Sequence, residues 1–453
     1  MRVTSNRVGV LIAGGVAVAS MACGQGAPPA GPESAPGAVA IVGAQLIDGN
    51  GGAPVEDAIV VVHEGRILAA GGRADTAIPA GAEVVDAAGQ TVIPGLVETH
   101  AHYNGDLDRV AGQYRTQLYF GVTTSRSIGS DPPEKAALAL DARAGRLAGP
   151  RMYTAGLGFS HHDNGFPPGR PINRPETEEE ARELVRGLAG QGVHFVKMWV
   201  DVAPPAAPTA ITPEMRTAIV EEARVNGLVP VAHIGAEADF HQLAGIGVTD
   251  FLHTVRDTEP GPAFFERCRE MGAVFSPTLT NIHAGWLWAE RPELLDDPEI
   301  RAAFEPEALA RWADPEYRAG VLEGPGLANR RARLESAMAW MKQIADAGVP
   351  VAVGTDSGAS SFNVPMGWGT HHELEIYVDA GLTPMQALVA ATRTGAELLS
   401  GGEADYGTLV PGKAADLILL DANPLDDITN TRAIDRVMQG GVWLDRAELL
   451  PAR

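Results

Sequence analysis

Short apolar runs alternate with amphipathic segments through the middle of the chain. The runs predict strands at residues 91–96, 122–126, 151–155, 194–200, 229–233, 250–253, 273–277 and 349–356. Helix start signals separate several of them. Thr177 with Glu180 forms a capping-box pattern, and Thr212 and Thr383 are each followed by a proline suited to a first helical turn.

Strands that alternate with helices are usually parallel and joined by right-handed crossovers. Eight such units close into a (β/α)8 TIM barrel, which we assign to residues 95–402. A doubly wound open sheet is the alternative α/β architecture. No glycine-rich nucleotide-binding fingerprint opens the first helix, however, which argues against it.

The segments on either side of the barrel share a different pattern, in which short β runs are broken by Gly, Asp and Asn. Neither end has enough strand for a stable sheet of its own. We therefore expect residues 39–94 and 403–450 to pair into one small β-sandwich, with the barrel inserted between them.

Residues 281–325 interrupt the alternation with several prolines and with Trp286, Trp288 and Trp312. An insertion between the seventh and eighth strands would emerge on the active-site face of a barrel. It is expected to form a lid or a pocket wall; the alternative is a packing elaboration away from the chemistry.

The first residues differ from the rest. Residues 1–22 combine early arginines with a small, apolar run that fits a secretory signal, and Cys23 follows a small-residue cleavage site as in a bacterial lipoprotein. Residues 23–38 have the composition of a flexible Pro/Gly linker. We expect export to the periplasm, either with a lipid on Cys23 that anchors the protein to the outer membrane or by plain secretion.

Composition adds limits on partners. The 453 residues carry 35 Lys and Arg against 57 Asp and Glu, a net charge of −22, which disfavours nucleic acid as a partner and leaves Cys23 as the only expected link to a membrane. Cys268 is the one other cysteine, so no disulfide framework is expected. The sequence leaves a homo-oligomer open.

Candidate chemistry gathers where the expected strands end. His100 and His102 alternate in an extended segment, so their side chains share a face. His-x-His alone is a weak signal, but the carboxyl ends of all barrel strands meet at one rim. The residues expected there are His100, His102, Lys197, His233, His253 and Asp356.

Lys197 stands out because it lies inside an apolar run, where an amine loses its hydration and must deprotonate or find a partner. One hypothesis is that the neutral amine takes up CO2 and that the resulting carbamate bridges two metal ions. The alternative is a lysine that reaches the barrel mouth and pairs with Asp201.

This set of residues resembles the metal-dependent amidohydrolase superfamily. The segments 196–201, 232–235 and 251–256 are similar to its imidazolonepropionase-related and Xaa-Pro dipeptidase branch, and 407–420 to its C-terminal signature. The resemblance covers about residues 40–445. Its deaminase branch usually has a glutamate three residues after the fifth-strand histidine; here Ala236 occupies that position and Glu237 follows it.

The resemblance implies two divalent metal ions, with Zn2+ expected. His100, His102 and Asp356 would hold the deeper ion, and His233 and His253 the outer one. Carboxylated Lys197 and a hydroxide would bridge the two. Asp356 would then act as general base and general acid.

Substrate contacts are less well marked. Arg126 ends the second strand and is a candidate for binding a substrate carboxylate, or else pairs with an acid. His161 and His162 follow the third strand and are candidates for substrate contact, or else a solvated pair.

We therefore expect an exported amidohydrolase that cleaves an amide C–N bond in a small molecule, such as an N-acyl amino acid, an Xaa-Pro-type dipeptide or a cyclic amide. The alternatives are a mononuclear deaminase, an esterase or lactonase with the same site, and a surface-anchored binding protein without catalysis. The fold by itself does not select a substrate.

Overall fold

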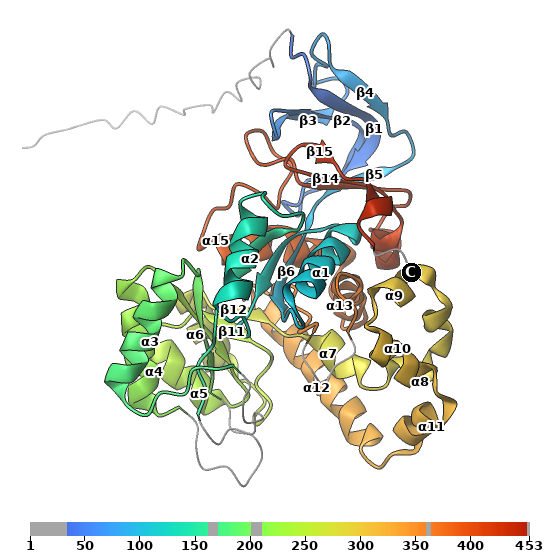
Figure 1. Cartoon of the computed structure of the whole chain (residues 1–453). Coiled ribbons are helices and arrows are strands. Elements are labelled where there is room, and N and C mark those ends of the chain that lie inside the picture. Colours follow the sequence, from blue (N-terminus) through green and yellow to red (C-terminus); the bar gives the residue numbers. More distant parts are fainter. Residues whose placement is uncertain (1–33, 162–170, 201–210, 359–363, 451–453) are drawn as a thin grey trace, which may run out of the picture.

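A β-sheet domain built from both ends of the chain stands on a barrel from its middle (Figure 1). In this computed structural model, the described residues are 34–161, 171–200, 211–358 and 364–450. Within these ranges, no helix combines the length and the apolar character needed to cross a membrane.

The sheet domain contains eight strands in the order β15-β14-β13-β5-β1-β2-β3, with β4 paired to β1. Their bounds are β1 Val39–Leu46, β2 Val55–His63, β3 Arg66–Gly72, β4 Glu83–Asp86, β5 Thr91–Pro94, β13 Leu417–Leu420, β14 Ile434–Gln439 and β15 Val442–Trp443. The central pairing joins β5 to β13 in antiparallel register, with Ile93 opposite Ile418. The two ends of the chain thus complete one sheet.

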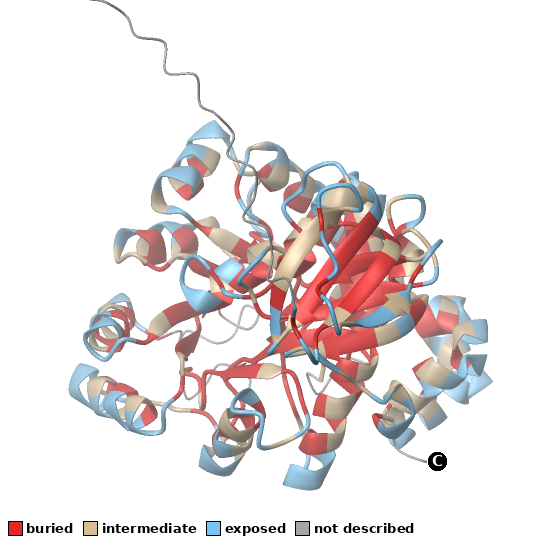
Figure 2. Ribbon diagram, turned by 90° about the horizontal axis from the view of Figure 1, so that it is seen from above, coloured by how far each residue is buried: buried red, intermediate tan, exposed pale blue. Residues whose placement is uncertain are grey.

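The strand β13 is a continuous apolar run because both of its faces are covered. Ile418 and Leu420 pack into the large core that includes the barrel, whereas Leu417 and Leu419 pack into the separate core of the sheet domain. Alternate residues of a strand point to opposite faces, so four consecutive leucine and isoleucine side chains join the two domains. Figure 2 shows buried residues concentrated along the strands.

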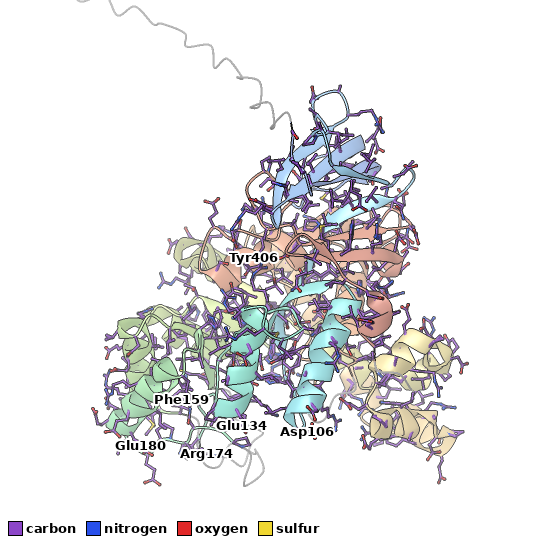
Figure 3. All side chains as sticks on the ribbon, turned by 45° about the horizontal axis from the view of Figure 1, so that its top comes forward. Asp106, Glu134, Phe159, Arg174, Glu180 and Tyr406 are labelled. Carbon is purple, nitrogen blue, oxygen red and sulfur yellow. The ribbon has the colours of Figure 1, made fainter. Side chains whose placement is uncertain are left out.

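The barrel strands are parallel and lie in two sheets, β6-β7-β8 and β9-β10-β11-β12. Their bounds are β6 Leu96–Ala101, β7 Val122–Ser127, β8 Arg151–Thr154, β9 Phe195–Trp199, β10 Val229–His233, β11 Asp250–Leu252 and β12 Val274–Ser276. Three isolated parallel bridges close the ring: Phe159 (labelled in Figure 3) to Met198, Phe275 to Val351, and Ala101 to Ser357. The predicted TIM barrel with a terminal β domain is confirmed.

Helices cover the outside of the barrel, and three of them begin at the predicted caps. The side chains of Thr177, Thr212 and Thr383 each accept a backbone hydrogen bond three residues on, and only Thr383 forms a complete capping box. The helices are α1 Leu107–Tyr119, α2 Pro133–Arg143, α3 Glu178–Gly190, α4 Pro213–Val225, α5 Glu237–Gly245, α6 Pro262–Met271, α12 Leu327–Asp346, α13 Trp368–Asp379, α14 Pro384–Val389 and α15 Gly395–Ser400, with a π-helical turn at Ala390–Thr394.

The expected insertion is a group of short helices beside the barrel (Figure 1). These are α7 Leu279–Ala284, α8 Leu287–Glu290, α9 Pro298–Ala303, α10 Pro306–Ala313 and α11 Pro315–Glu323, with a 3-10 turn at Pro292–Asp296. Further 3-10 turns occur at Ile428–Arg432 and Arg446–Glu448. Trp288 and Trp312 are buried in a core of their own, which extends to Trp368 of α13.

Two strand boundaries differ from the prediction. The expected first barrel strand, 91–96, splits at Gly95 into β5 of the sheet domain and β6 of the barrel. A side chain at Gly95 would collide with Thr123, so the glycine allows the chain to pass closely between the domains. The expected eighth strand, 349–356, makes bridges only at its two ends.

Candidate metal centre

Backbone pairing at the rim of the barrel brings Asp356 against the first two histidines. His100 is in β6, and His102 is the first residue after the end of this strand. The amide of Asp356 donates to the carbonyl of His100 at 2.7 Å, and the amide of His102 donates to the carbonyl of Ser357 at 2.8 Å. This register places the aspartate side chain beside both imidazoles.

One carboxylate oxygen therefore contacts two rings. Asp356 Oδ1 lies 3.2 Å from His100 Nε2 and 3.0 Å from His102 Nε2. The other oxygen, Oδ2, accepts a hydrogen bond from the side-chain amide of Asn281, at the start of the insertion. The ligand atoms of His100, His253 and Asp356 all lie within 4.8 Å of one another. Two imidazoles and a carboxylate at this spacing suit a divalent transition metal.

His233, at the end of β10, and His253, directly after the adjacent strand β11, extend the cluster. Their ring centroids are 4.0 Å apart, and the His253 ring lies 5.0 Å from that of His100. Nδ1 of His253 is 2.6 Å from the hydroxyl of Thr278. That contact orients the ring and leaves Nε2 as its ligand atom, which is the usual role of an outer hydrogen bond to a metal-binding histidine.

Lys197 lies in β9, fully buried, on the same side of the barrel. Two glycines make room for it: a Cβ at Gly129 or Gly158 would lie 2.8 or 3.1 Å from its Cγ. After burial, which has the largest effect, the charge of Lys197 is among the causes that lower the pKa of His100 and of His253. The lysine amine is therefore close enough to both histidines to act on their charge.

Burial keeps the central histidines neutral. It lowers the pKa of His100 to about 3 and that of His253 well below its usual value. Burial alone would raise the pKa of Asp356, but the adjacent His100 and His102 lower it well below 3.8. Neutral imidazoles and an ionised carboxylate are the protonation states that bind a cation. The donor set therefore fits a metal ion.

The rim also concentrates uncommon backbone conformations. Five non-glycine residues of the described chain have a positive φ, and three are at this site: His253 (70°), Thr278 (58°) and Asp356 (57°). Such conformations persist where the surrounding structure fixes them, and they cluster at functional sites.

A buried glutamate that the sequence pattern does not single out holds the backbone at and beside the candidate ligands. Glu98 of β6 accepts hydrogen bonds from the amides of His100 (2.8 Å) and Thr355 (3.0 Å) and from the hydroxyl of Thr370 (3.0 Å). Burial raises the pKa of Glu98 to about 8. The only feature of the sequence that could indicate this role is that Glu98 lies two residues before His100. Its hydrogen bond with the amide of Thr355 forms only when the barrel closes.

A cavity of about 300 Å³ opens over the cluster. It is lined by His233, His253, Thr254, Arg256, Pro277, Thr278, Asn281, Ile282, Gly285, Arg330, Arg333 and Asp356. The first turn of the insertion thus forms part of the wall, while Trp288 and Trp312 lie in the separate core and Trp286 packs into the large core. Asn281 and Arg330 are further residues that the sequence did not single out, since neither lies at a strand end.

Two of the predicted substrate residues, Arg126 and His161, do not line this cavity. Of the two roles considered for Arg126, the structure shows pairing with an acid: its guanidinium is fully buried against Asp250 and donates to the carbonyl of Thr99 at 2.7 Å. His161 is partly exposed and is absent from the described cavity lining. His162 lies outside the described residues, as does Asp201.

Comparisons with known proteins identify the family to which this chain belongs. A sequence model described as the Amidohydrolase family matches residues 91–444. The chain is 26% identical to 8-oxoguanine deaminase from Pseudomonas aeruginosa, covering 89% of this chain and 92% of the relative. It is also 26% identical to ochratoxinase from Aspergillus niger, covering 89% and 86%. A solved structure described as a putative prolidase from Bifidobacterium longum superimposes with a TM-score of 0.73 at 25% identity, covering 92% and 96%.

Proposed function

Since this chain belongs to the amidohydrolase family and is a metal-dependent hydrolase, we propose that it cleaves an amide C–N bond in a small substrate. The candidate substrates are N-acyl amino acids, Xaa-Pro-type dipeptides and cyclic amides. The observation that carries the proposal is the position of Asp356, whose carboxylate contacts His100 and His102 beside the cavity.

Two groups of side chains would hold the metal. His100, His102 and Asp356 would hold one ion, and His233 and His253 a second, with Zn2+ as the expected metal. A bound divalent cation lowers the pKa of water towards neutrality and polarises a carbonyl oxygen. The protein supplies the fixed geometry, since the histidines lie on or directly after barrel strands and Asp356 lies in the eighth segment, which closes the ring.

Asp356 is the proposed acid–base group. Its Oδ2 is oriented by the Asn281 amide, and its carboxylate is ionised before the reaction. It would accept a proton from the attacking water and then donate that proton to the departing amine nitrogen, which completes cleavage of the C–N bond. No other proton source is required by this sequence of steps.

Carboxylation of Lys197 remains a proposal. A carbamate would supply negative charge that offsets two cations held largely by histidines. Its support is the position of the lysine, which is buried in β9 and near enough to His100 and His253 for its charge to act on them. Native mass spectrometry should show the added mass of one CO2, which is lost on acidification and absent from Lys197→Ala. Full activity of Lys197→Ala would exclude the role.

Deamination is the second candidate, favoured by the similarity to 8-oxoguanine deaminase. The position of Glu237 speaks against it. This glutamate accepts a hydrogen bond from the hydroxyl of Thr258 and contacts Nε2 of His241 at 3.2 Å, and it is not among the described residues that line the cavity. Product analysis distinguishes the two, because deamination of a base releases ammonia whereas the proposed reaction releases an amino acid.

The test is a substrate screen. Zinc-loaded protein is incubated with panels of N-acyl amino acids, dipeptides and cyclic amides, with aminopurines included, and the release of primary amine and of ammonia is measured separately. We expect amine release that depends on added metal. Ammonia release from purines alone would replace the proposal with deamination, and ester or lactone cleavage alone would indicate the third chemistry considered.

We also propose that the protein is exported, with a lipid on Cys23 as the anchor. The support is the pattern of residues 1–23, which lie outside the described structure. In a bacterial host, labelled palmitate should be incorporated into the full chain and should be lost in Cys23→Ala. Recovery of the full-length chain only from the cytoplasm would refute export.

A further inference from the structure

Positive charge gathers in the cavity of an acidic protein. Arg256, Arg330 and Arg333 line the same cavity as the candidate metal ligands, and Asp356 is the only acid in its described lining. The whole chain carries a net charge of −22. A guanidinium that pairs with no acid within such a cavity favours an anionic ligand at that point.

Arg330 is the most informative of the three. It lies on α12, partly buried, and its Nε is enclosed without a hydrogen-bond partner. Within the described part of the chain, no acid pairs with its guanidinium. The adjacent Arg331 is different: it is exposed and forms an ion pair with Glu290. Enclosing a charged group without a partner is unfavourable, so Arg330 is poised for a partner from outside the chain.

We propose that Arg330 binds a carboxylate of the substrate. A guanidinium presents two parallel N–H groups that match a carboxylate, which gives both orientation and affinity. The inference rests on the proposed amide hydrolysis and narrows it. N-acyl amino acids and dipeptides carry the required carboxylate next to the scissile amide, whereas a neutral cyclic amide does not.

The size of the cavity agrees with this class. About 300 Å³ is at the lower end for small-molecule sites, which suits a single acylated amino acid or a dipeptide better than a polypeptide. Ile282 and Pro277 add apolar surface to the same wall. The substrate would therefore place its amide at the metal site and its carboxylate at Arg330.

The test compares a substrate with its neutral counterpart. N-acetyl-L-leucine and N-acetyl-L-leucinamide are supplied to the zinc-loaded enzyme and acetate release is followed. We expect Arg330→Met to lower kcat/KM for the carboxylate by about 10- to 100-fold, mainly through KM, because a charge-assisted hydrogen bond is lost. The kcat/KM for N-acetyl-L-leucinamide should be unaffected by Arg330→Met. Arg331→Met is the matched control and should behave as the wild type.

A binding measurement separates this inference from the proposed function. L-leucine and isoamylamine differ only by the carboxylate, and neither is hydrolysed. Calorimetry should show leucine binding in the wild type and in Arg331→Met, with at least a tenfold loss in Arg330→Met. That result supports the role of Arg330 even if no amide is turned over, in which case the hydrolase proposal alone fails.

Three outcomes would overturn the inference. They are absence of leucine binding to the wild type, equal binding by the wild type and Arg330→Met, and equal turnover of the two acetylated compounds by the wild type. In the last case amide hydrolysis itself still stands. Unchanged thermal unfolding of Arg330→Met confirms that the variant is folded.

Discussion

Asp356 is held in place by the chain on both sides of it. Its φ of 57° is a left-handed conformation that aspartate tolerates better than most residues. Two glycines nearby permit the close approach: a Cβ at Gly354 would lie 2.8 Å from the Cβ of His100, and one at Gly358 would overlap the carbonyl oxygen of His102. The carboxylate is therefore fixed relative to the histidines before any ligand binds.

The first prediction concerns Asp356→Asn. The amide is nearly isosteric and keeps one oxygen towards the rings, but it accepts no proton from water. We expect kcat to fall by about 10²- to 10⁴-fold, while metal content measured by elemental analysis is largely retained. Asp346→Asn, at an exposed ion pair with Lys342 on α12, is the control and should keep full activity. Near-normal turnover in Asp356→Asn would exclude the acid–base role.

The second prediction concerns Arg126. Its ion pair with Asp250 is completely buried, so Arg126→Met leaves a carboxylate without compensation and should cost about 3–5 kcal/mol of stability. Arg126→Met with Asp250→Leu removes both charges and should recover most of the loss in urea unfolding. If KM rises in the folded double variant while stability is restored, Arg126 contributes to substrate binding after all.

At this scale the sequence predicts whatever depends on alternation along one strand. His100 and His102 share a face because they are two residues apart, and the ends of apolar runs predict His233 and Asp356 at the rim. Asn281 and Arg330 belong to helices whose placement depends on how the insertion folds back over the rim. Their distance from the site is set by tertiary packing, which no local pattern records.

Among the elements, α7 matters most for the orientation of Asp356, because it holds Asn281 within hydrogen-bonding distance of the carboxylate. The helix is short, and its first backbone amides are capped from another helix. Glu373 of α13 is buried and accepts hydrogen bonds from the amides of Leu279 (2.8 Å) and Thr280 (2.6 Å). A carboxylate at the start of a helix satisfies groups that the helix itself cannot.

The third prediction follows from this cap. Burial raises the pKa of Glu373 from its ordinary value of 4.5, which applies to the unfolded chain, to about 7 despite the two amide hydrogen bonds. Between these values the folded protein holds a proton that the unfolded chain has lost. The stabilisation is therefore complete below about pH 4.5 and is lost as the pH rises through 7, up to about 3 kcal/mol.

Glu373→Gln provides the measurement, because glutamine does not titrate. Thermal unfolding of both proteins in chelator should show the wild type losing stability relative to Glu373→Gln between pH 5 and pH 8. Buried Glu98 titrates in both proteins and cancels in the comparison. A constant difference across this range would contradict the raised pKa.

The strand boundaries show what a sequence pattern leaves undetermined at this scale. The apolar run 91–96 is continuous, yet it serves two sheets, because Gly95 lies against Thr123 in a contact between distant segments. The segment 349–356 also begins with an apolar run, but it makes β-bridges only at Val351 and at Ser357, just beyond its end. Apolar character predicts burial in both cases, whereas the pairing partner depends on the closed ring.

At the scale of the whole molecule, the site and the closure of the barrel depend on each other. The candidate ligands come from β6, β9, β10, β11 and the eighth segment, and that last segment closes the ring through the bridge from Ala101 to Ser357. The sheet domain adds a second constraint, because β5 leads directly into β6 and pairs with β13 from the other end of the chain. Tyr153 and Tyr406, the latter labelled in Figure 3, add a contact of 2.9 Å between their hydroxyls.

The fourth prediction is that metal removal lowers the stability of the whole molecule and not only its activity. A ligand that binds the folded state alone stabilises it by about 2.7 kcal/mol when its concentration is 100 times its dissociation constant. Here the ligands come from separate strands, so binding would cross-link the barrel. Chelation should lower Tm, and added Zn2+ should restore both Tm and activity.

The control for this last measurement is a chain that folds but lacks the central ligands. In His100→Ala with Asp356→Ala, two of the three atoms that converge within 4.8 Å are removed, so Zn2+ should leave Tm unchanged apart from weak surface binding. If Zn2+ raises Tm equally in this variant and in the wild type, the stabilising ion lies elsewhere. If it raises Tm only in the wild type, the same side chains that hold the ion also connect the strands of the barrel.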